Sequence, residues 1–201
     1  SRIVYGGFGV WSPDAQGNFP QPETFVDGSV PDGAIDPRGS GWIYPELLLD
    51  SEVHIITALI HREVFDRIGG FDESLRTGSD YDFWIRASRH FAMTRMARCV
   101  ALYRTNPQSI SFRPQPVNNA YVLLTRAVEL YGYAGPDGRR TDVPAFRRRL
   151  ALICFNFAWL HFQRGDRRVA PPAAPPAVRP PPPHPPARRG WGGGGPPGGR
   201  G

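Results

Sequence analysis

The chain has 201 residues and a formal net charge of +6 at neutral pH, from 24 basic and 18 acidic residues. Four of the basic residues lie in the last 33 residues (169–201), which contain 12 prolines, 8 glycines and no acid. The body before them has 20 basic and 18 acidic residues, and this near balance does not favour nucleic acid as a partner. Because a tail of this composition cannot bury enough apolar surface to fold, we expect 169–201 to be disordered.

Strand and helix patterns alternate along the body, which indicates an α/β fold. Strands are expected at 2–11, ending or bending at the glycines at 6 and 7, at 53–60 as a buried extended segment, and at 93–103. Helices are expected at 45–49, 62–68, 80–91, 118–131 and 144–163. A long loop spans 18–40, with one possible short strand at 24–26. The chain is therefore divided into 1–112, a helical extension at 113–168 and the tail at 169–201.

The stretch 68–86 combines three glycines, four acids and four aromatic residues. Three of its residues follow helical spacing and should face the core: Tyr81, Trp84 and Ile85. Ser79 is placed to cap the helix, and Asp82 three residues later completes a capping box. Asp80 opens the helix, where free backbone N–H groups and the helix dipole favour its ionised form. Because Asp80 and Asp82 lie about 200° apart around the helix axis, they cannot act as one pair.

The residues themselves leave two interpretations for each remaining acid. Asp80 is either a general base or an ordinary acid of a first helical turn. Asp72 and Glu73 follow a double glycine, which lets the backbone approach a ligand closely. The same two acids also suit the solvated rim of a tight turn that Phe71 anchors in the core.

Three motifs occur in order: the run from Thr57 to Phe65, Gly-Gly-Phe-Asp-Glu at 69–73, and Gly-Ser-Asp-Tyr-Asp-Phe-Trp-Ile-Arg at 78–86. Together they resemble the C-terminal, acceptor-side half of family 2 glycosyltransferases with the GT-A fold. The resemblance implies transfer of a sugar, with inversion, from a nucleotide-sugar to an acceptor hydroxyl, with Asp80 as the general base. It also implies a set of substrate-binding residues: Gly70, Phe71, Asp72, Glu73, Trp84 and Arg86.

The sequence departs from the family pattern at several points. Ser79 stands where the family has Glu, and Asn106 stands where many relatives have His. The family's donor half, with an Asp-x-Asp motif for Mg²⁺ or Mn²⁺, is not in the sequence, so the divalent metal expected for the family lacks its motif ligands here. A truncated or frame-shifted, non-catalytic remnant is therefore the alternative. A chain without that half should expose sheet edge and apolar surface and be only marginally stable.

Partners and location follow from the same features. The resemblance implies a nucleotide-sugar donor and a saccharide, lipid-linked or protein acceptor. Cys99 and Cys154 form no CxxC pair, and the longest apolar run (150–162) is too short to span a bilayer, so we expect a cytoplasmic protein. The helix at 144–163, with Arg147–Arg149 near its start, either packs on the domain or lies on a membrane surface. The tail is a spacer, an out-of-frame translation or a ligand for a polyproline-binding module.

Overall fold

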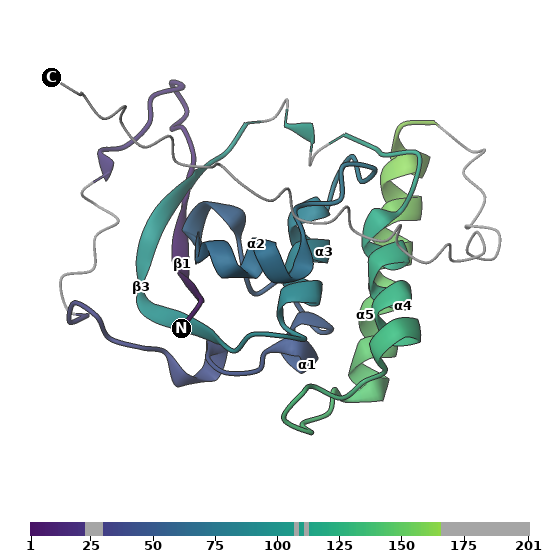
Figure 1. Cartoon of the computed structure of the whole chain (residues 1–201). Coiled ribbons are helices and arrows are strands. Elements are labelled where there is room, and N and C mark those ends of the chain that lie inside the picture. The colour runs from purple at the N-terminus through teal and green to yellow at the C-terminus, as the bar shows by residue number, and fades with distance from the viewer. Residues whose placement is uncertain (23–29, 107–108, 111–112, 166–201) are drawn as a thin grey trace, which may run out of the picture.

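The computed structural model describes residues 1–22, 30–106, 109–110 and 113–165 (Figure 1). The possible short strand at 24–26 and the tail at 169–201 lie outside these residues. The elements in chain order are β1 (Ile3–Trp11), η2 (Pro37–Gly39), α1 (Tyr44–Leu47), η3 (Ile55–Thr57), β2 (Leu59–Ile60), α2 (Arg62–Ile68), α3 (Ser79–Ala87), β3 (Met93–Arg104), α4 (Asn119–Tyr131) and α5 (Val143–Gln163). This mixture of helices and a small sheet confirms the predicted α/β class.

The three-stranded sheet has the order β2-β1-β3. β1 pairs antiparallel with β2 and parallel with β3. Of the two alternatives predicted for 2–11, an end near Gly6 and Gly7 is wrong, because the strand runs for nine residues from Ile3 to Trp11. The glycines produce shifts in the β1–β3 register instead of an end. A Cβ atom at Gly6 would lie only 2.8 Å from the Val100 side chain, so glycine allows the two strands to approach closely there.

The prediction of one buried extended segment at 53–60 is also wrong. Val53 is buried, but the chain then turns through η3 and pairs with β1 only over the two residues of β2. Thr57 closes the turn, since its backbone N–H and its hydroxyl both donate to the His54 carbonyl, at 3.0 and 2.8 Å. Leu59 is consequently left 77% exposed. Local hydrogen bonding therefore outweighs the apolar composition of this segment.

One edge of the sheet is covered by part of the long loop predicted at 18–40. Residues 34–41 run beside β3, with antiparallel bridges from Ile35 to Met96 and from Gly41 to Met93. The Tyr5 hydroxyl, from β1, donates to the Gly39 carbonyl at 2.7 Å. The sheet edge that we expected to be exposed is thus paired along part of β3.

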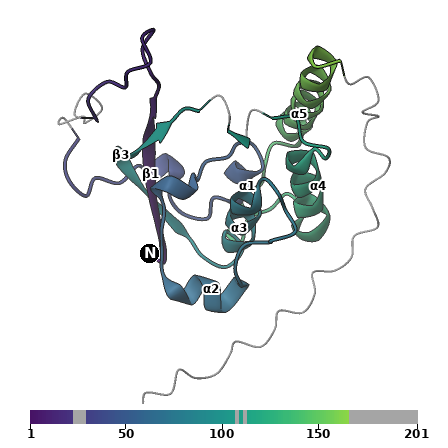
Figure 2. The same cartoon turned by 90° about the horizontal axis from the view of Figure 1, so that it is seen from above.

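Helix α3 lies at the centre of the molecule, between the sheet and the antiparallel pair α4 and α5 (Figure 2). Tyr81, Trp84 and Ile85 are buried, as their spacing predicts. The helix ends at Ala87, four residues earlier than predicted, because the buried Ser88 hydroxyl donates back to the Ile85 carbonyl. Phe83 and Ala87 of the same helix are also buried. The remaining core residues come from elements between β1 and α5: Ile3, Tyr5, Ile43, Tyr44, Leu47, Leu48, Val53, Val64, Ile68, Met93, Leu123, Leu124, Ala127 and Phe146.

Helices α2, α4 and α5 agree closely with their predicted ranges. Gly69 and Gly132 end α2 and α4 with positive φ angles of 78° and 67°. Asn118 caps α4 by accepting from the backbone of the third helical residue, and Asp142 caps α5 in the same way. These local signals are strong enough to be read without knowledge of the tertiary structure.

Candidate functional site

The turn at 69–78 connects α2 to α3 and contains most of the predicted substrate-binding residues. Asp72 builds this turn, because its Oδ1 accepts from the Ser74 backbone N–H at 3.0 Å and from the Ser74 hydroxyl at 2.6 Å. The hydroxyl bond is the main reason that the pKa of Asp72 lies below its ordinary value. The Asp72 carboxylate is therefore engaged within its own turn.

Arg86 holds the start of the turn against α3. Its Nε donates to Asp82 Oδ2 at 2.7 Å, one helical turn away. Its two terminal nitrogens donate to the carbonyls of Ile68 and Gly70, both at 2.8 Å. One guanidinium thus joins the end of α2, the double glycine and α3 through charge-assisted hydrogen bonds.

The predicted capping box of Ser79 and Asp82 is wrong. Ser79 is the first residue of α3, and the N-cap is Gly78, which has a φ of 80° and makes no side-chain cap. The Asp82 carboxylate is instead paired with the Arg86 guanidinium, one helical turn later in α3. Asp82 therefore has the structural role that its position suggested, but its partner is Arg86 and not the start of the helix.

The aromatic residues of the site divide into a partly exposed and a buried set. Phe71 is 39% exposed, and its ring centroid lies 4.8 Å from that of Phe83 and 6.3 Å from that of Phe65. It is therefore less deeply anchored than predicted and presents apolar surface to solvent. Trp84 is 0% exposed and packs beneath the site, and its Nε1 lacks a hydrogen-bond partner among the residues described.

Asp80 has a different environment from Asp72 and Asp82. It is the second residue of α3, and its side chain is only partly buried. Oδ1 accepts from the Tyr81 backbone N–H at 2.9 Å. Within the described part of the chain, Oδ2 makes no hydrogen bond or ion pair. Asp80 is therefore an acid at a helix N-terminus that keeps an oxygen able to accept a proton.

Helix α4 forms a further wall of the site that the sequence did not indicate. Asn119 donates to the Thr77 carbonyl at 3.1 Å and to the Thr77 hydroxyl at 2.8 Å. Leu123 contacts the position where Gly78 would carry a Cβ atom, and Arg126 contributes to lowering the pKa of Asp72. Because these contacts join residues at least 42 positions apart, no local pattern in the sequence could have shown them.

The residues present do not fit a divalent metal ion at the Asp80–Asp82 pair. The Arg86 guanidinium already occupies Asp82 Oδ2, and the two side chains leave α3 in different directions. Across the part of the chain that the structure describes, no group of three or more His, Cys, Asp or Glu side chains could hold a metal ion. None of the described residues is therefore assigned to a metal.

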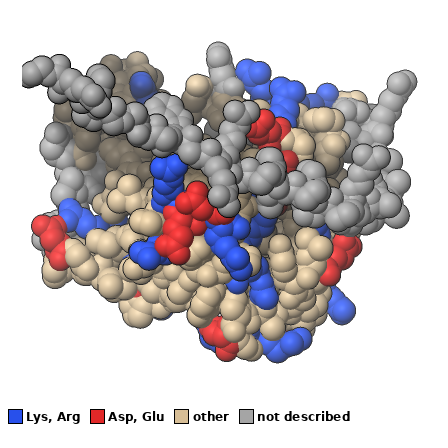
Figure 3. Space-filling view, viewed as in Figure 1, with Lys and Arg blue, Asp and Glu red and all other residues tan. Residues whose placement is uncertain are grey.

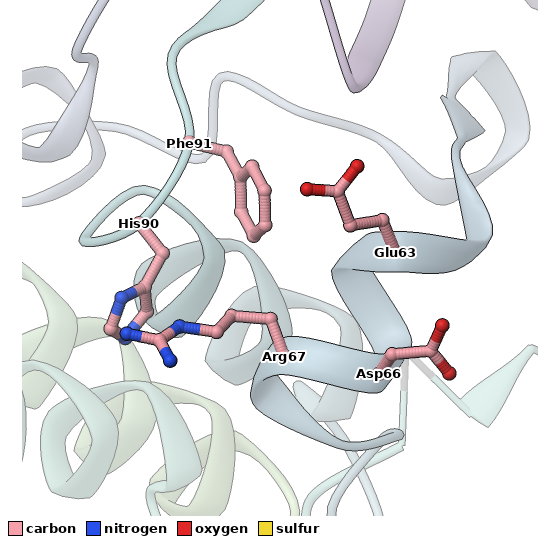
Figure 4. Close-up of a pocket in the computed structure, with 5 residues that line it drawn as sticks. All are labelled: Glu63, Asp66, Arg67, His90 and Phe91. Atoms are coloured by element: carbon pink, nitrogen blue, oxygen red, sulfur yellow. The ribbon is translucent and has the colours of Figure 1, made fainter.

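A hollow of about 400 Å³ lies at α2 and is separate from the predicted site residues. Five residues line it: Glu63, Asp66, Arg67, His90 and Phe91 (Figure 4). Burial, and then the nearby arginines 67 and 89, lowers the pKa of His90. Because two acids and one arginine line the hollow, it favours neither sign of charge in a ligand. Acidic and basic side chains also lie side by side on the face shown in Figure 3.

Comparison with protein-family models, with curated proteins and with solved structures found no match for this chain.

Proposed function

We propose that this chain forms the acceptor side of a glycosyltransferase, with Asp80 as the general base. In the reaction, Asp80 removes the proton of an acceptor hydroxyl while the hydroxyl oxygen attacks the anomeric carbon of a nucleotide-sugar. The bond to the nucleotide diphosphate breaks on the opposite face of the sugar, which inverts the anomeric centre. The divalent metal typical of such enzymes would balance charge on the departing diphosphate when bound, and no residue described here is assigned to it.

The observation that carries this proposal is the difference among the acids of the stretch 68–86. Asp72 accepts two hydrogen bonds that close its own turn and Asp82 is ion-paired with Arg86, whereas Asp80 accepts only one hydrogen bond, from the Tyr81 backbone N–H, among the described residues. A general base needs a carboxylate oxygen within hydrogen-bond reach of the proton that it removes, and Asp80 is the least engaged of these three acids. Asp80 also lies at the position of the base in the motif that resembles the glycosyltransferase family.

The neighbouring residues take supporting roles in this proposal. Phe71 offers a partly exposed ring on which a sugar can stack, and Glu73 offers an exposed carboxylate that can accept from sugar hydroxyls. A Cβ atom at Gly70 would meet nothing within 4 Å, so this side of the turn is open space that leaves room for a ligand. Arg86 and Trp84 position the turn and α3 rather than contact the substrate.

The test is release of nucleotide from a panel of nucleotide-sugars by a protein that carries this chain together with a donor-binding half, measured with simple glycosides and with lipid-linked sugars as acceptors. Asp80→Asn keeps an oxygen for the Tyr81 N–H but removes the base, so we expect the acceptor-dependent rate to fall by about 10²–10⁴-fold. The matched control is Glu129→Gln, which removes an exposed acid from α4 and should leave the rate unchanged. Full activity of Asp80→Asn would exclude Asp80 as the base. If the wild-type protein with both halves releases no nucleotide, the proposal is contradicted and the non-catalytic alternative is favoured.

A further inference from the structure

Helix α5 carries a row of exposed apolar side chains along one face. The four members of this row recur every three or four residues and are 49–62% exposed: Leu152, Phe155, Trp159 and Phe162. The rings of Phe155 and Trp159 are nearly parallel, with centroids 6.4 Å apart, and those of Trp159 and Phe162 are 5.8 Å apart. We name these four residues the α5 ridge. Isolated exposed apolar residues are ordinary, but a continuous aromatic row marks an interaction surface.

The opposite face of α5 already packs on the protein. Phe146 is buried in the core, and the buried His161 ring nitrogen lies 3.0 Å from the Gln115 carbonyl. Asn118 also donates to the Ile153 carbonyl at 3.4 Å, which holds the start of α4 beside the middle of α5. The helix therefore cannot roll to bury the α5 ridge without losing these contacts. Helix α5 is apolar on both faces, and the protein covers only one of them. The α5 ridge therefore needs a partner from outside the domain to cover it.

The charges around the α5 ridge are mainly basic, and Asp142, the N-cap of α5, lies 3.9 Å from Arg148. From Val143 to Arg164 the sequence contains four arginines and no acid. Arg147 and Arg148 are exposed before the ridge, and Arg148 lies four residues before Leu152 on the same face; Arg164 follows the ridge. Arg149 is excluded from this group, because it donates inward to the Leu47 carbonyl at 3.1 Å. The sequence after α5 (166–201) adds six arginines and one acid.

We infer that the α5 ridge docks onto an anionic lipid bilayer, with the helix axis in the plane of the membrane. The rings would enter the boundary between headgroups and acyl chains, and the arginines at both ends would contact lipid phosphates. None of the described helices is long and apolar enough to cross a membrane. A second copy of the chain is a poorer occupant, because pairing two ridges in either direction brings arginines together with no acid of α5 to neutralise them. The proposal does not rest on the proposed sugar transfer.

The test uses the full chain and two kinds of vesicle, one of phosphatidylcholine alone and one with an equal part of phosphatidylglycerol. We expect binding in flotation only with the anionic vesicles, accompanied by a blue shift of tryptophan emission as Trp159 enters the apolar boundary. The triple substitution Leu152→Ser, Phe155→Ser and Trp159→Ser should weaken binding by about a hundredfold or more. Arg147→Gln and Arg148→Gln should each weaken it by about fivefold, and added salt should reduce this effect.

A matched control replaces three exposed apolar residues of the sheet region, Val10→Ser, Ile56→Ser and Leu59→Ser, and should bind vesicles like the wild type. Because the ridge is exposed, the triple variant should keep the wild-type circular dichroism spectrum. Trp159→Phe should keep most of the binding but lose the emission shift, which locates the contact at the ridge. The proposal is overturned if the wild type ignores anionic vesicles or if the triple variant binds as well as the wild type. It is also overturned if the wild type is a dimer and the only effect of the triple substitution is to make the protein monomeric.

Discussion

Helices α3 and α5 both place a tryptophan on an apolar face, yet the structure covers them differently. Trp84 in α3 is 0% exposed, whereas Trp159 in α5 is 49% exposed. Helix α3 lies between the sheet and the pair α4 and α5, whereas α5 lies at the margin of the molecule, away from the sheet (Figures 1 and 2). An apolar face in a sequence thus shows that a surface is to be covered. Its place in the fold decides whether the protein itself covers it.

The arginines of the two helices show the same contrast. Arg86 in α3 makes an ion pair and two hydrogen bonds to backbone carbonyls, and its side chain is mostly buried. Arg148 in α5 has one long ion pair, at 3.9 Å from Asp142, and remains largely exposed. The arginine of α3 therefore maintains the structure, and the arginine of α5 is available to an external anion.

The largest expected difference between the two helices comes from their tryptophans. Trp84→Ala should lower the free energy of unfolding by about 3–5 kcal/mol, because it leaves a large cavity in the core. Trp159→Ala should change it by less than about 0.5 kcal/mol, because half of that side chain is in water. Urea denaturation of the two variants measures both values. Similar losses in the two would show that α5 is covered by the protein in solution.

Substitutions of the arginines in α3 and α5 should differ in unfolding free energy in the same direction as the tryptophan substitutions, but by less. Arg86→Ala should lower the free energy of unfolding by about 2 kcal/mol, since it leaves Asp82 and two carbonyls without their partner. Arg148→Ala should cost less than about 0.5 kcal/mol, as expected for an exposed pair. Arg86→Lys should not restore the wild-type value, because a lysine cannot reach three acceptors in a planar fork. If lysine restored the full stability, Arg86 would not be the residue that joins the end of α2 and the double glycine to α3.

The smallest expected effect is a pH dependence at the turn that Arg86 holds. The pKa of Asp72 is lowered in the folded chain, chiefly by the Ser74 hydroxyl, so folding favours its ionised form. This contribution is present above the unfolded value near 3.8 and is lost as the pH falls through the folded value. Asp72→Asn keeps an acceptor for Ser74 but cannot ionise. The stability difference between wild type and variant should therefore shrink as the pH falls below about 4, and a difference that stays constant below that pH would oppose this origin.

Part of the site could be predicted because its signals are local. The motif order pointed to the stretch 68–86, and helical spacing placed Tyr81, Trp84 and Ile85 in the core, as the structure confirms. The assignment of Asp80 as a base remains a prediction, and so does the GT-A architecture. The contact of Asp82 with Arg86 was missed, because a capping box and an ion pair at i,i+4 use overlapping residues and the sequence does not rank them. The wall formed by Asn119 was missed because its partner, Thr77, lies 42 residues away.

The sequence by itself determined the α/β class and the ranges of α2, α4 and α5, because helix caps and terminating glycines act over a few residues. It also determined that α5 would be apolar with arginines near its start. Only the tertiary structure decided that β1 continues through its glycines, that residues 34–41 cover part of β3, and that one apolar face of α5 stays exposed. Each of these depends on which distant segments come together, and short-range preferences do not specify that.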